Sequence, residues 1–113
     1  MTSVHGLGRH ASATINGMKN GNDILSAENY KRLMSDAVRL PDNDAGYGYF
    51  WKKMDSGLYG HTGGDPGITT VMFIDENNGF GHLAFFNGTA KEAGFYRMVV
   101  NLLFKYGKKV EKL

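Results

Sequence analysis

The sequence predicts an α+β domain in which helices flank an antiparallel sheet of about three to four strands. Apolar residues recur at helical spacing in residues 26–40 and 90–106. Two further apolar runs are separated by four residues that end in Asn78-Gly79, which is a strong hairpin signal. Connections of only a few residues require neighbouring strands to run antiparallel. The length of 113 residues fits one domain, or a piece of one.

The first predicted helix is short and covers residues 11–18. Ala11, Ile15 and Met18 would share one face of it. Residues 1–10 show no clean period and contain two glycines, so we expect a loop there.

The other two helices have clearer ends. Residues 26–40 carry one apolar stripe, Ser26 is a good N-cap, and Pro41 prevents the helix from continuing. Residues 90–106 carry a wider apolar face, and Gly107 is placed as a C-terminal cap. We therefore expect two amphipathic helices that can cover a sheet.

Four strands are predicted. The aromatic run 47–53 favours a strand, and residues 58–62 form a second candidate before the breaker cluster 63–67. The two strongest candidates cover residues 68–75 and 80–87, and they form the hairpin.

Composition excludes several functional classes. The chain has no cysteine, so disulfides, thiolate catalysis and cysteine-ligated metals are excluded. A net charge of +2 gives no argument for nucleic acid or for a membrane surface as a partner. The apolar runs are shorter than the roughly 18 residues that a membrane span needs. Residues 1–10 lack the pattern of a signal peptide, and the compartment stays undecided.

The segment from Tyr59 to Gly67 is the most unusual one for chemistry. It places His61 and Thr62 at the end of a predicted strand, among four glycines. Glycines let a substrate approach the backbone, and free N–H groups at a strand edge can stabilise an oxyanion in acyl transfer. The alternative interpretation is a glycine-rich connection that carries a surface histidine.

Several short motifs occur in a fixed order over nearly the whole chain. They are Asn16-Gly17-Met18-Lys19-Asn20-Gly21, Ile24-Leu25-Ser26-Ala27-Glu28, Met34, Tyr47-Gly48-Tyr49-Phe50-Trp51 and Gly60-His61-Thr62-Gly63-Gly64-Asp65-Pro66-Gly67-Ile68. In this order and with these gaps, the chain resembles the C-terminal part of the serine β-lactamase and penicillin-binding-protein superfamily, especially its class C-like and esterase-like branch. The resemblance implies that residues 1–113 form a single partial domain.

The resemblance also implies a substrate-binding strand. His61-Thr62-Gly63 resembles the family's Lys-Thr-Gly motif, with histidine in place of lysine, and that strand forms one wall of the active site. The backbone N–H of Gly64 would resemble one of the two oxyanion-hole donors. Members of the family are usually periplasmic or secreted.

The family's nucleophile is missing from this sequence. It is the serine of a Ser-x-x-Lys motif. No serine here has lysine three residues later, and no tyrosine fits the family's Tyr-x-Asn or Tyr-x-Ser element. The serines are Ser3, Ser12, Ser26, Ser35 and Ser56. We therefore expect a fragment of a β-lactamase-like serine hydrolase that is inactive alone. The alternative is a non-catalytic α+β module for binding or oligomerisation.

Partners follow from the sheet that the resemblance implies. The strand that begins at Phe80 and ends at Asn87 would lie beside two N-terminal strands in the family. Without them its edge would be open to another chain. We expect a homodimer, or pairing with the missing N-terminal portion of the parent hydrolase. We expect no nucleic acid or membrane partner and no cofactor. The four histidines lack zinc-ligand spacing, so we expect no metal.

Overall fold

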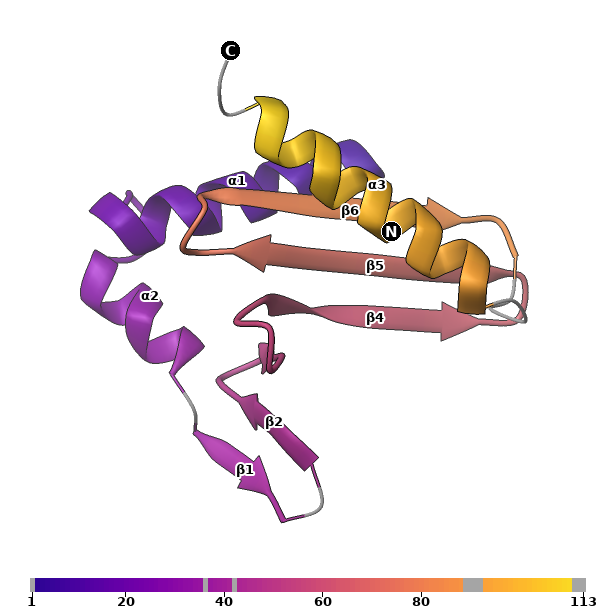
Figure 1. The fold of residues 1–113 in the computed structure, drawn as a ribbon. Helices are drawn as coiled ribbons and strands as arrows, with labels where there is room; N and C mark the ends of the chain where they lie inside the picture. Colours follow the sequence, from indigo (N-terminus) through magenta and orange to yellow (C-terminus); the bar gives the residue numbers. More distant parts are fainter. Residues whose placement is uncertain (1, 36, 42, 89–92, 111–113) are drawn as a thin grey trace.

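The computed structural model describes residues 2–35, 37–41, 43–88 and 93–110. Within these residues the chain forms three helices and six strands (Figure 1). In chain order they are α1 (Val4–Asn20), α2 (Ala27–Met34), β1 (Val38–Leu40), β2 (Asn43–Tyr47), β3 (Lys52–Lys53), β4 (Tyr59–Asp65), β5 (Ile68–Asp75), β6 (Phe80–Phe86) and α3 (Ala93–Val110).

The six strands form one open antiparallel sheet in the order β1-β2-β3-β4-β5-β6. Each strand pairs with the next one along the chain, as the short connections require. The predicted α+β class with an antiparallel sheet is confirmed. The predicted number of three to four strands is wrong, because β1 was assigned to a helix and the run 47–53 is divided between β2 and β3.

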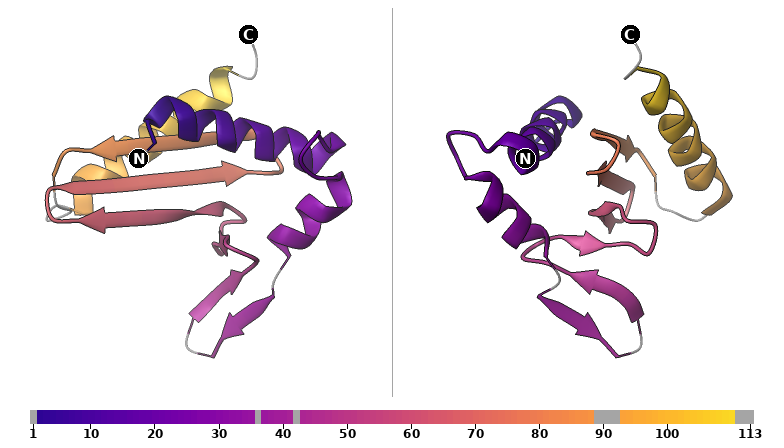
Figure 2. Two further views of the ribbon diagram at one scale, coloured as in Figure 1. Left: turned by 180° about the vertical axis from the view of Figure 1, so that it is seen from behind. Right: turned by 60° about the vertical axis from the view of Figure 1, so that its left-hand side comes forward.

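Two helices cover opposite faces of the sheet, as Figure 2 shows. On one face, here called the α1 face, Ile15 of α1 and Ile74 of β5 belong to one buried cluster, and Leu83 of β6 packs against it. On the other, the α3 face, the ring of Phe104 lies 5.2 Å from that of Phe80 and 5.0 Å from that of His82. Successive residues of a strand point to opposite faces, so β6 contributes apolar side chains to both layers.

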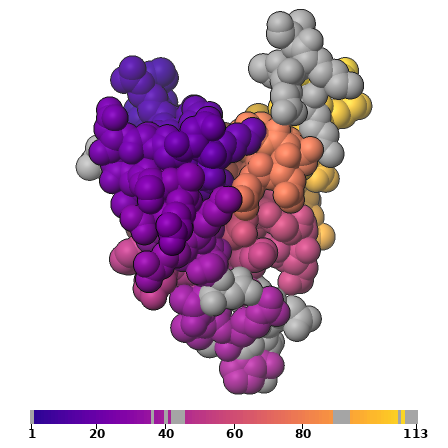
Figure 3. Space-filling model, turned by 90° about the vertical axis from the view of Figure 1, so that its left-hand side faces the viewer, coloured from indigo at the N-terminus to yellow at the C-terminus, as the bar shows by residue number. Residues whose placement is uncertain are grey.

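Helix α2 packs against α1 through the buried side chain of Tyr30. Tyr30 is 6% exposed, and its ring lies against Gly17, where a Cβ atom would come within 2.2 Å of it. Asn22 fixes the ring, because its Nδ2 donates to the Tyr30 hydroxyl at 2.9 Å. The Oδ1 of Asn22 also accepts from the backbone N–H of Ile24 and of Leu25. Figure 3 shows the surface that α1 and α2 form together, with the β1–β2 hairpin projecting below them.

The helix ends differ from the sequence predictions. Helix α1 begins at Val4 rather than at residue 11, because Ser3 caps it by accepting from the N–H of Gly6 at 3.1 Å. Packing of α1 on the sheet outweighs the cost of its glycines, about 1 kcal/mol each. Helix α2 ends earlier than the predicted residue 40. Ser35 is its C-cap, and residues 38–40 form strand β1, which pairs with β2.

The end of α3 was also predicted incorrectly. Gly107 lies inside this helix and contacts the Phe80 ring, so it is no C-terminal cap. The start predicted at residues 90–92 lies outside the described residues. Among the residues that the structure describes, no helix is both long and apolar enough to cross a bilayer.

Strand β4 continues through the predicted breaker cluster. Gly63, Gly64 and Asp65 pair with β5, and only Pro66 and Gly67 form the turn. The second hairpin is confirmed, since β5 and β6 pair along their lengths and Gly79 has a φ of 73°. Strand β6 ends one residue before the predicted Asn87.

Candidate functional site

The four residues predicted to bind substrate all lie exposed on β4, as the third to sixth of its seven residues. His61 is opposite Met72, and Thr62 is opposite Val71. Cross-strand partners share a face, and Met72 is opposite Leu83 on the α1 face. His61 therefore points to the α1 face, whereas Thr62 points to the α3 face. The sheet separates the two side chains, although they are adjacent in the sequence.

The edge of β4 next to β3 is open beyond Gly60. Of the residues of β4, strand β3 pairs only with Tyr59 and Gly60. The two-residue turn after Asp65 makes Asp65 and Ile68 a hydrogen-bonded pair, and such pairs alternate along an antiparallel ladder. The N–H groups of Thr62 and Gly64 must then point away from β5. Among the described residues no strand covers them.

The His61 ring lies against the loop between β2 and β3. Its Nε2 donates to the carbonyl oxygen of Phe50. The Trp51 ring is 6.3 Å from the His61 ring and 6.1 Å from the His10 ring, on which it stacks. Trp51 is only 8% exposed, so the indole is buried, whereas the two histidines near it are exposed. This group joins α1, the β2–β3 loop and β4.

Sequence reasoning found His61 but did not place His10 or Phe50 beside it. His10 was assigned to a loop, yet it lies in α1, one turn before Thr14. Phe50 lies in the aromatic run 47–53, which we expected to form a strand. The glycine within that run was the available signal for a break. A Cβ atom on Gly48 would lie 2.4 Å from the carbonyl oxygen of Leu33, so the chain turns tightly against α2 at that point.

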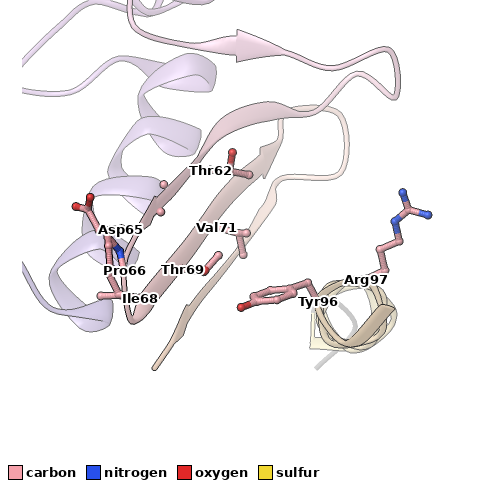
Figure 4. A pocket seen from close by; sticks show the side chains of 10 residues that line it. Thr62, Asp65, Pro66, Ile68, Thr69, Val71, Tyr96 and Arg97 are labelled. Carbon is pink, nitrogen blue, oxygen red and sulfur yellow. The ribbon is translucent and has the colours of Figure 1, made fainter. Parts of the chain in front are cut away.

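A separate groove lies on the α3 face. It has a volume of about 780 Å³ and is lined by Thr62, Gly63, Gly64, Asp65, Pro66, Ile68, Thr69, Val71, Tyr96 and Arg97. Figure 4 shows the ring of Tyr96 directed toward Thr69 and Val71, while Arg97 points away from the strands. Three of the four predicted substrate residues thus line this groove, and His61 does not.

The serines either occupy helix ends or are exposed. Ser3 and Ser26 cap α1 and α2, and the Ser35 hydroxyl donates to the Arg32 carbonyl at 2.8 Å. Ser12 and Ser56 are exposed. In the described part of the chain, no hydrogen bond joins a serine to His61, and no group of three His, Asp or Glu side chains could hold a metal ion.

His82 is buried between aromatic rings. It is 5% exposed, and its ring lies 5.5 Å from that of Phe73 and 5.0 Å from that of Phe104. Burial lowers the pKa of His82, and the nearby Asp75 carboxylate opposes this shift. Its Nε2 has no hydrogen-bond partner among the described residues. His82 belongs to strand β6, and its ring packs in the interior.

Comparisons with protein-family models, with curated proteins and with solved structures give no match. The α+β class therefore rests on the structure itself. The resemblance to serine hydrolases remains a prediction from the ordered motifs.

Proposed function

We propose that this chain supplies the sheet wall of an acyl-transfer site of the β-lactamase type and lacks the attacking group. The observation that carries the proposal is the open edge of β4, where the N–H groups of Thr62 and Gly64 face outward. At about 3.3 Å per residue these two donors lie too far apart to share one oxygen, so the N–H of Gly64 would be one donor to an oxyanion or a carbonyl oxygen, and the second donor would come with the attacking group. The His61 imidazole lies on the same strand, and among the described residues it makes no hydrogen bond to a serine.

This proposal predicts that the chain alone is inactive. A nucleophile must be deprotonated by a base within hydrogen-bond reach, and among the described residues the His61 ring is hydrogen-bonded to the backbone carbonyl of Phe50 instead. Purified protein should hydrolyse neither a chromogenic β-lactam nor a nitrophenyl ester above background. Turnover that disappears in His61→Ala would overturn the claim of inactivity.

The oxyanion wall can be tested without a nucleophile. Acetate titrated into ¹⁵N-labelled protein should shift the amide signals of Thr62 and Gly64 saturably. Gly64→Pro removes the outward N–H of residue 64. Acetate should then no longer shift the amide signal of the neighbouring Thr62. Gly64→Ala is the matched control, because a Cβ atom there meets only the Ile68 carbonyl oxygen, at 3.9 Å. Equal acetate binding by both variants would contradict the proposal.

A second candidate function is assembly with another polypeptide. Strand β6 ends the sheet order, and its seven residues include no Asp, Glu, Lys, Arg or Pro to discourage pairing. The outer side of α3 exposes Phe95, Met98, Leu102 and Tyr106 by 45% to 57%. An open edge beside an apolar helix surface favours a second chain, and a second copy of this one is the occupant that we propose.

A further inference from the structure

Phe50 combines an exposed apolar side chain with an unfavourable backbone conformation. Its side chain is 88% exposed, the highest value among the large hydrophobic residues that the structure describes. Its φ is 66°, the only positive φ of a described residue other than glycine. A side chain in this region strains the backbone, and such strain persists only where the surroundings impose it.

The surroundings of Phe50 do impose it. The N–H of Gly48 donates to the Trp51 carbonyl at 2.8 Å, and that of Tyr49 donates to the Leu33 carbonyl at 2.9 Å. The Phe50 carbonyl accepts from His61 Nε2. Buried Trp51 anchors the end of the loop in the core. The loop is therefore fastened on both sides of a residue whose ring meets solvent.

The loop that carries Phe50 lies next to the candidate site. The bond from His61 to the Phe50 carbonyl places the loop directly against β4, at the start of its open edge. Tyr49, the preceding residue of the same loop, is 59% exposed. An apolar group bound at this edge would thus find an aromatic surface, which favours another aromatic ring in offset or edge-to-face contact.

We propose that Phe50 is a specificity-determining residue, which selects acyl compounds whose acyl group carries an aromatic ring. This inference rests on the proposed role of β4 as the wall of an acyl-transfer site. The aromatic group would pack on Phe50 and Tyr49, while its carboxyl or carbonyl oxygen meets the outward N–H groups of β4.

The test compares phenylacetate with acetate. Trp51 is the single tryptophan of the chain and lies beside His61, so its fluorescence reports binding there. We expect phenylacetate to bind about tenfold more tightly than acetate. In Phe50→Gly this preference should fall to about one, with acetate affinity unchanged. Glycine adopts the φ of Phe50 without strain, so this variant should keep the loop.

Two controls complete the experiment. Phe50→Tyr retains a ring and should retain the preference, and Phe95→Ala removes an exposed ring from α3 and should not alter it. Equal binding of both acids to the wild type, or a preference that survives in Phe50→Gly, overturns the role of Phe50 and leaves the wall intact. Failure of both acids to bind overturns this role and the proposed wall together.

Discussion

His82 shows what burial does to a titratable side chain in this fold. Desolvation lowers its pKa because a charged imidazolium would lose its water between Phe73 and Phe104. The nearby carboxylate of Asp75 already accepts two hydrogen bonds from Asn78, one from its backbone N–H at 3.0 Å and one from its Nδ2 at 2.7 Å. The imidazole is thus a neutral packing group, and acid should destabilise the fold through it.

The pH dependence has a definite sign. Below the ordinary pKa of 6.5, His82 is protonated in the unfolded chain, whereas in the folded chain its lowered pKa keeps it neutral until the pH falls further. The stability that His82 contributes is therefore full above that pH and is lost as the pH falls toward the lowered folded value. His82→Phe should remove this slope, and should stabilise the protein by about 1 kcal/mol because the unpartnered Nε2 is gone. Urea unfolding at pH 5 and pH 7 measures both effects; parallel losses in wild type and variant would contradict them.

Two glycines of α1 should respond oppositely to alanine. At Gly17 a Cβ atom would enter the Tyr30 ring, which Asn22 holds in place, so Gly17→Ala should cost about 1 to 3 kcal/mol. At Gly8 the same atom meets only Leu83, at an ordinary 3.9 Å, and Gly8→Ala should stabilise by up to about 1 kcal/mol through helix propensity. Thermal unfolding of both variants measures the difference; a stable Gly17→Ala protein would show that the ring moves freely.

The helices show how local signals and packing compete. A helix of eight residues such as α2 is too short to be stable alone, so its cap and its buried Tyr30 must support it. The residues after Met34 leave the helix because the sheet offers hydrogen bonds there: the N–H of Ala37 donates to the Tyr47 carbonyl at 2.7 Å. Periodicity alone cannot show that such a partner exists.

The cap of α2 can be tested directly. The Ser26 hydroxyl accepts from the N–H of Asn29 at 3.3 Å. Ser26→Ala should lower the free energy of unfolding by about 1 kcal/mol, and Ser26→Asp should preserve it. Ser12→Ala, at an exposed position inside α1, is the control and should change little. Chemical denaturation followed by circular dichroism measures these differences, and equal losses at residues 12 and 26 would argue against a capping role.

The sheet is open at both ends, and this determines what the chain can assemble with. Strand β1 ends it on a projecting hairpin, whereas β6 ends it between two helices (Figure 1). Strand β6 is the longer and more apolar of the two edges. An edge of this kind pairs readily with a copy of itself.

Charge on β6 should therefore weaken self-association. Phe85 is opposite Thr70 on β5, so the alternation of hydrogen bonds directs its N–H to the open edge. Phe85→Lys should shift the protein toward the monomer at tens of micromolar, whereas Phe85→Ala removes the same ring without adding a charge and should shift it less. Light scattering distinguishes the species. A wild-type protein that is monomeric throughout this range would remove the proposed dimer.

Local chemistry in the sequence determined the α+β class, the Asn78-Gly79 hairpin and the Ser26 cap, and it indicated His61 as a candidate site residue. These features depend on neighbours in the chain, and so a linear pattern contains them. Only the tertiary structure decided that β4 runs on through Gly63 and Gly64, that His61 and Thr62 lie on opposite faces, and that His10 joins His61 around Trp51. Those outcomes depend on which strand or helix lies opposite, and non-local hydrogen bonds and packing outweigh the local preference of a glycine or a short apolar run.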